Sequence, residues 1–183
     1  MRLLFLSNMM VAKGVFVLLE ACAQLRKENI SFECHFVGDW LDITEASFNQ
    51  KVAEMSLSKN VFAHGKKYDL EKNSFYQQSD IFVFPSLDEA FPLVLLEAMQ
   101  FKLPVVTSDV GGVKDIVVDQ QTGFIVQKND ADALTSKLIS LIKDHALRDT
   151  MGIAGKKRFE EHFTLEKFEK RFLTILNEVA DAA

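Results

Sequence analysis

The chain has few cysteines, prolines and glycines, the residues in which collagenous, low-complexity and disulfide-rich proteins abound. Its 183 residues include 2 cysteines, 3 prolines and 8 glycines. This scarcity, with 48% hydrophobic and 26% charged residues, excludes a collagenous or low-complexity chain and indicates one globular domain. Cys22 and Cys34 lie in apolar stretches without metal-ligand spacing, so we expect buried free thiols in a reducing compartment.

The chain also lacks an excess of basic residues and a long apolar run. With 21 basic and 26 acidic residues the formal charge is -5, which argues against a nucleic-acid partner. No run of about 18 apolar residues occurs, so we predict no membrane-spanning helix. The apolar start at 3–6 is interrupted by Ser7 and Asn8 and lacks a cleavage pattern. It therefore predicts a buried strand and a cytoplasmic protein.

Short apolar segments alternate with segments of helical spacing. We predict strands over 3–6, 32–37, 61–64, 81–84, 105–107 and 123–126, and helices over 15–27, 45–57, 70–78, 92–100, 113–118 and 131–142. Continuously apolar strands such as IFVF are typical of sheets covered on both faces. The pattern predicts a Rossmann-like α/β domain with a parallel six-stranded sheet and helices on both faces.

The remainder of the chain is predicted to be a helical tail, over 146–163 and from 165 to about 180. The last helix carries an apolar stripe at spacings of three and four: Leu165, Phe168, Phe172, Ile175, Leu176 and Val179. The simpler expectation is that this helix docks on its own domain. The alternative is that the stripe continues onto a partner.

The loop after the fourth predicted strand should hold a ligand, because α/β sheets bind ligands beyond the carboxyl ends of their strands. Pro92 suits the first turn of a helix and would leave the amides of Leu93 and Val94 unpaired. Unpaired amides at a helix start, with the positive end of the helix dipole behind them, attract phosphate groups.

Two carboxylates flank this helix start and could hold two hydroxyl groups of one ligand. Glu89 lies in the loop and Glu97 lies inside the helix. Each also has a structural explanation, Glu89 as a charge at the helix start and Glu97 as a solvated helix residue. Glu97 stands in an otherwise apolar stretch, where an unpartnered charge would be costly.

Two glycine-containing loops are further candidates. In 7–14, Lys13 could bind a diphosphate and Gly14 would let the backbone pass close by, although a loop lysine is often only solvated. Gly111 and Gly112 offer a second close approach, or an ordinary tight turn. No dinucleotide or P-loop glycine motif occurs.

Histidines and nucleophile motifs contribute little. Only His64, before Gly65, is placed at a strand end to line a cleft. No zinc-ligand spacing and no G-x-S-x-G nucleophile elbow is present, so we predict neither a metal site nor a serine hydrolase.

Five segments resemble, in order and spacing, the family-four retaining glycosyltransferases: KGVFVLLEA, FVG, DIFVFPSLDEAFPLVLLEAM, PVVTSDVGGVKDIV and TGFIV. The resemblance covers nearly the whole chain. It corresponds to the carboxy-terminal, nucleotide-sugar-binding half of the two-domain GT-B architecture. Its most specific part is the pair Glu89 and Glu97, separated by seven residues.

The resemblance implies a role for each matching residue. Glu89 would contact the hydroxyls of the transferred sugar, Glu97 the ribose hydroxyls, and Lys13 the diphosphate. The other implied donor-binding positions are Asn8, Gly14, Gly38, His64, Gly65, Phe91, Pro92, Leu93 and Val94. Asn8 stands where the family usually has an arginine, which removes one cation, and Ala90 stands where glycine is common.

The resemblance also implies a reaction. A sugar would pass from a nucleoside-diphosphate sugar to an acceptor hydroxyl, as in polysaccharide biosynthesis, with retention at the anomeric carbon and without a metal ion or cofactor. Residues 1–183 would form the donor domain of a longer enzyme, whose absent amino-terminal half binds the acceptor and provides any peripheral membrane association. Alternatives are a nucleotide-sugar epimerase or phosphorylase, or a non-catalytic nucleotide-binding module.

Overall fold

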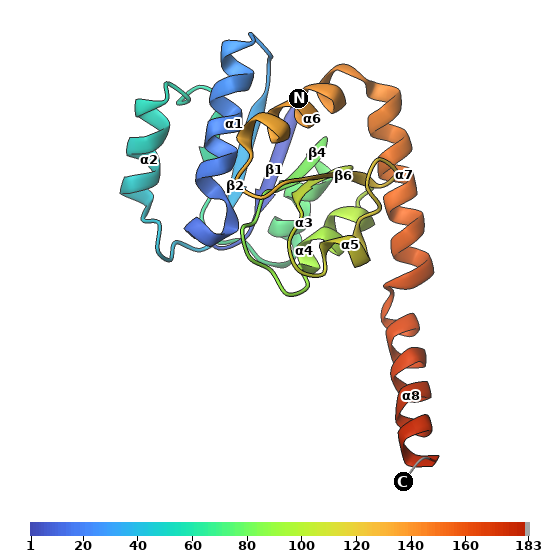
Figure 1. The fold of residues 1–183 in the computed structure, drawn as a ribbon. Helices are drawn as coiled ribbons and strands as arrows, with labels where there is room; N and C mark the ends of the chain where they lie inside the picture. Colours follow the sequence, from blue (N-terminus) through green and yellow to red (C-terminus); the bar gives the residue numbers. More distant parts are fainter. Residues whose placement is uncertain (182–183) are drawn as a thin grey trace.

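Six parallel strands form one sheet in the computed structural model, which describes residues 1–181 (Figure 1). The strands are β1 (Arg2–Leu6), β2 (Glu33–Val37), β3 (Val61–Ala63), β4 (Ile81–Phe84), β5 (Val105–Ser108) and β6 (Gly123–Val126), in the order β3-β2-β1-β4-β5-β6. The predicted fold class is confirmed, and every predicted strand boundary lies within one residue of the structure.

Within residues 1–181, eight α-helices and one short 3-10 helix lie between the strands or after the last of them. They are η1 (Val11–Lys13), α1 (Val15–Lys27), α2 (Glu45–Glu54), α3 (Asp69–Gln77), α4 (Leu93–Gln100), α5 (Val113–Ile116), α6 (Ala131–Lys143), α7 (His145–His162) and α8 (Leu165–Asp181). Helix α2 stops three residues before the predicted end. There Ser56 takes a left-handed φ of 57°, and the Leu57 amide bonds back to the Val52 carbonyl.

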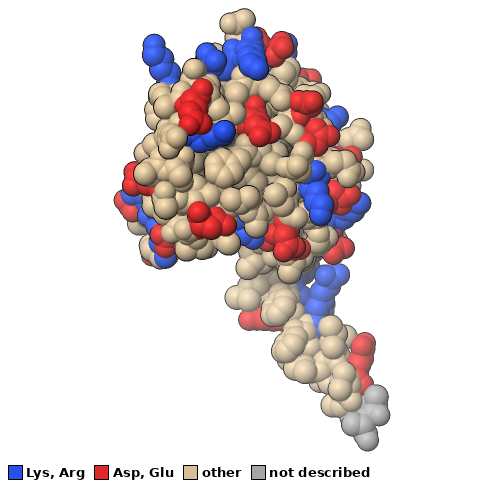
Figure 2. Space-filling view, turned by 60° about the vertical axis from the view of Figure 1, so that its left-hand side comes forward, with Lys and Arg blue, Asp and Glu red and all other residues tan. Residues whose placement is uncertain are grey.

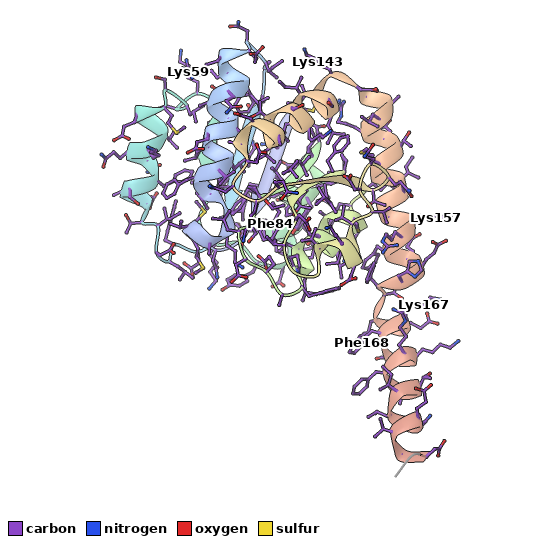
Figure 3. The ribbon with its side chains drawn as sticks, viewed as in Figure 1. Lys59, Phe84, Lys143, Lys157, Lys167 and Phe168 are labelled. Atoms are coloured by element: carbon purple, nitrogen blue, oxygen red, sulfur yellow. The ribbon has the colours of Figure 1, made fainter. Side chains whose placement is uncertain are left out.

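The helices cover both faces of the sheet. Helix α1 packs against α6 on one face, while α4 packs against α7 and contacts α3 on the other. The strand side chains between these layers are buried, and Phe84 lies in the centre of the domain (Figure 3). Both cysteines are buried free thiols, as predicted.

The strand order reverses between β1 and β4, which places the loops that follow these two strands side by side. Leu3 of β1 pairs with Ile81 of β4, and the Leu87 amide bonds to the Ala12 carbonyl at 2.8 Å. The carboxyl ends of the strands at such a reversal are where doubly wound sheets bind ligands.

Helix α8 projects away from the domain (Figure 1). The prediction that it docks on its own domain is wrong for the described residues, since none of its residues is buried. Phe168 points into solvent and is 62% exposed (Figure 3). The reason is that α7, which packs on β6, leads the chain past the edge of the sheet, so that α8 contacts α7.

The surface drawn in Figure 2 carries basic and acidic side chains in alternation over the body, without a large patch of one sign. One side of the projecting helix is mostly uncharged. Within residues 1–181, no helix combines the length and the apolar character needed to cross a membrane.

We predict that a chain ending at residue 163 unfolds at nearly the same temperature as the full chain, because α8 buries nothing. The expected change is within about 4 °C, the shift that about 1 kcal/mol makes in a domain of this size. A chain ending at residue 143 is the control. It lacks the buried Met151 and Gly152 of α7 and should melt far lower. A large loss on removing α8 alone would mean that this helix stabilises the domain, contrary to the prediction.

Candidate functional site

The adjoining β1 and β4 loops bring Lys13 and Glu89 together. The Lys13 Nζ lies 2.7 Å from the Glu89 Oε1, and their side chains are 24% and 11% exposed. Lys13 ends the turn η1, whose C-cap is Gly14 with a left-handed φ of 75°. A Cβ atom on Gly14 would lie 1.8 Å from the Pro85 carbonyl oxygen, so this contact between the loops requires glycine.

Ser86 is a member of the site that sequence reasoning did not single out. Its hydroxyl is fully buried and lies 3.1 Å from the Glu89 Oε1, and also 3.1 Å from the carbonyl oxygens of Ala12 and Asp88. It therefore links both loops to the carboxylate. Its place directly after Pro85 at the end of β4 is the one signal that points to it.

The glycine pair after β5 supports the loop that carries Glu89. Gly111 has a φ of 49°, and a Cβ atom there would lie 1.8 Å from the Glu89 carbonyl oxygen. The Gly112 amide donates to the Ala90 carbonyl at 2.8 Å. The close approach predicted from the sequence is thus made by the protein's own backbone.

The start of α4 is open. The helix begins at Leu93, one residue later than predicted, because Pro92 has an extended ψ of 98° and occupies the N-cap position. Within residues 1–181, the amides of Leu93 and Val94 donate to no protein acceptor, and the first amide bonded to the Pro92 carbonyl is that of Leu95. Phe91 and Leu93 are exposed beside them.

Glu97, which the sequence suggested as a ligand-binding or a solvated residue, has partners within the protein, on α3. The Tyr76 hydroxyl donates to the Glu97 Oε2 at 2.8 Å, and the Lys72 Nζ donates to its Oε1 at 3.0 Å. The Glu97 side chain remains 31% exposed. Burial is the main cause that raises the pKa of Tyr76 well above its ordinary value, and the Glu97 charge adds to it.

An open groove of about 1290 Å³ borders Glu97 on the side of α7 and α8. Its apolar wall includes Phe91, Leu93, Phe163 and Phe168. Lys13 and Glu89 do not line it. The groove therefore joins the exposed side of α8 to the start of α4, and the Lys13–Glu89 pair lies outside its lining.

Two other predicted donor-binding positions, Asn8 and Gly38, lie in the loops after β1 and β2. Asn8 is exposed in the β1 loop. Gly38 packs on that loop, since a Cβ atom there would lie 1.7 Å from the Ser7 carbonyl oxygen. The Gly38 amide also donates to the Gly65 carbonyl at 3.0 Å, which connects the β2 and β3 loops.

His64 is held against a second histidine. The His35 Nδ1 and the His64 Nε2 share a hydrogen bond of 2.8 Å. On the other side of the His35 ring, Nε2 lies 3.0 Å from the Arg2 Nε and 3.3 Å from the Glu33 Oε2. Burial is the largest cause that lowers the pKa of both rings, and nearby positive charge lowers that of His64 further. One nitrogen of the predicted site residue is thus used inside the protein.

We predict that the folded domain loses stability as the pH decreases below 6.5, the ordinary histidine pKa. Because the folded pKa values are lowered, the unfolded chain binds protons first, and stability is lost from about pH 6.5 down through the lower folded values. Thermal unfolding from pH 8 to 5 measures this. His64→Phe should reduce the pH dependence, while His162→Gln on the exposed surface of α7 should leave it intact. An unchanged profile for His64→Phe would exclude the pair as its cause.

Two glycines with similar backbone conformations test the packing of the Glu89 loop. Gly65→Ala introduces a Cβ atom at a φ of 64° with no atom within 4 Å, so we expect a loss of about 1–2 kcal/mol. Gly111→Ala adds the clash with the Glu89 carbonyl and should cost about 1–3 kcal/mol more. Denaturant unfolding compares the two, and equal losses would refute the packing argument.

Comparisons with known proteins agree on one family. Residues 2–158 match the sequence model of the family described as glycosyl transferases group 1. The chain is 31% identical over 182 residues to an uncharacterized glycosyltransferase of Methanocaldococcus jannaschii, covering 97% of this chain and 48% of that protein. It is 42% identical over 109 residues to the capsular polysaccharide biosynthesis glycosyltransferase CapM of Staphylococcus aureus, covering 57% of this chain and 29% of that protein.

A solved structure extends the likeness to the fold. The C-terminal domain of the glycosyl transferase group 1 family protein LpcC of Francisella tularensis matches with a TM-score of 0.80 and 27% identity, over 90% of this chain and 86% of that one. The chain spans about half the length of the Methanocaldococcus relative.

Proposed function

Because the chain belongs to the group 1 glycosyl transferases, we propose that it is the donor-binding domain of a retaining enzyme. That enzyme would transfer a sugar, a hexose in our proposal, from a nucleoside-diphosphate sugar to an acceptor hydroxyl. The observation that supports this most directly is the Lys13–Glu89 pair at the reversal of the strand order, in the loop that leads directly to the open start of α4.

The diphosphate would meet the start of α4. The unpaired amides of Leu93 and Val94 point along the helix dipole, and Lys13 uses one of its three ammonium protons for Glu89. Negative charge grows on the leaving diphosphate as the sugar departs. Donors fixed beforehand around that charge lower the barrier without reorganising.

The two carboxylates would bind hydroxyl groups. Within residues 1–181, Glu89 receives Lys13 and Ser86 on Oε1 alone, which leaves Oε2 for a hydroxyl of the transferred sugar. Glu97 retains acceptor positions for the ribose hydroxyls. Gly38 and the loop from His64 to Gly65 would border the nucleobase.

The side-chain charges of this site cancel, since Lys13 and Lys72 oppose Glu89 and Glu97. Asn8 adds no cation where the family usually has arginine. We therefore propose weak donor binding that depends on the helix amides, and no transfer without the acceptor-binding part of a longer enzyme. We also propose that no metal ion takes part.

Calorimetric titration with UDP, GDP and ADP tests the donor site. We expect one of them to bind, with Glu97→Ala weakening that binding at least about tenfold, or 1.4 kcal/mol, and with no effect of EDTA. Glu20→Ala on the exposed surface of α1 is the matched control and should bind as the unaltered chain does.

Two outcomes would contradict the proposal. Absence of heat with all three nucleotides, or unchanged affinity in Glu97→Ala, would favour a module without a donor site. Transfer of radiolabelled sugar to an added acceptor by this chain alone would refute the need for a second domain.

A further inference from the structure

Helix α3 holds Glu97 at both of its carboxylate oxygens. Lys72 and Tyr76 are four residues apart and therefore share one face of the helix. Tyr76 donates to Oε2 at 2.8 Å and Lys72 to Oε1 at 3.0 Å. Tyr76 is fully buried, whereas the Lys72 side chain is 29% exposed. The carboxylate thus has one partner in the core and one at the surface.

The Tyr76 ring has a fixed position. It stacks on Phe101 with centroids 5.2 Å apart and planes inclined by 2°, and it also packs on Phe82 at 5.7 Å. The raised pKa of the hydroxyl keeps it protonated at any working pH, so that it serves as a donor to Glu97. The core therefore presents a hydrogen-bond donor in one place and one direction.

A carboxylate has about four acceptor positions, two on each oxygen. Tyr76 and Lys72 fill one on each, and one on each remains. We propose that Tyr76 is a positioning residue that orients Glu97 so that these two remaining positions face a vicinal pair of ligand hydroxyls together, with Lys72 as the outer support. This inference rests on the proposed function, in which Glu97 receives the ribose.

The buried hydroxyl acts by penalising the other orientations of Glu97. If Glu97 turned away, Tyr76 would keep a donor without a partner inside the protein, which costs more than an ordinary hydrogen bond contributes. A carboxylate held in this way loses little further freedom when a ligand binds. A flexible surface glutamate would lose that freedom on binding.

Tyr76→Phe tests the proposal, because it keeps the stacked ring and removes only the hydroxyl. We expect it to weaken binding of the nucleoside diphosphate by about threefold to tenfold. Tyr68→Phe makes the same change at the chain's other tyrosine, which is 62% exposed, and should change nothing. Thermal unfolding of each variant verifies that it is folded.

The 2′,3′-dideoxy form of the same nucleotide separates positioning from a structural role. Tyr76→Phe should bind the dideoxy form as well as the unaltered chain does, because no ribose hydroxyl then needs Glu97. Adding Tyr76→Phe to Glu97→Ala should likewise cause no further loss. Equal weakening for both nucleotides, or an additive double variant, would overturn the proposal.

The remaining outcomes distinguish this inference from the proposed function. If Glu97→Ala binds normally, the ribose assignment fails. If Glu97→Ala weakens binding while Tyr76→Phe does not, only the positioning role fails.

Should Tyr76→Phe not fold, Lys72→Met at the surface provides the test. We expect it to weaken binding about twofold, and only for the nucleotide that has its ribose hydroxyls. No loss for Lys72→Met would then overturn the proposal.

Discussion

The candidate site depends on one close backbone contact, between the loop after β1 and the loop after β4. Gly14 lies against the Pro85 carbonyl, where no Cβ atom would fit, and the Leu87 amide bonds to the Ala12 carbonyl. The reversal of strand order brings the two loops to this position, and the contact brings Lys13 within reach of Glu89. Gly111 supports the second loop in the same way, by leaving room for the Glu89 carbonyl.

The two carboxylates are held by different parts of the molecule for what we propose are different tasks. Glu89 is anchored by Lys13 and Ser86 where the β1 and β4 loops meet, while Glu97 is anchored by Lys72 and Tyr76 of α3. Both keep part of their acceptor capacity unused. A ligand that spans them would need hydroxyls at both ends and negative charge between them, as a nucleoside-diphosphate sugar has.

Apart from the Lys13–Glu89 region, the apolar groove beside α4 and the projecting α8 form a second region of exposed surface. Phe163 and Phe168 line the groove together with Phe91 and Leu93 at the start of α4. This surface contributes little to the core, because α8 has no buried residue. The start of the proposed phosphate-binding helix thus lies between this groove and the loop that carries Glu89.

The sequence by itself determined the elements and the chemistry of single residues. Alternating apolar strands and helices predicted the sheet, and the isolated charge in an apolar helix marked Glu97 as a candidate ligand-binding residue. Tertiary structure alone decided which residues meet: that Lys13 pairs with Glu89, that Ser86 joins them, that His64 turns to His35, and that α8 stands free. Local pattern reports propensity and burial, whereas contacts between residues 76 positions apart depend on strand order and on where each helix ends.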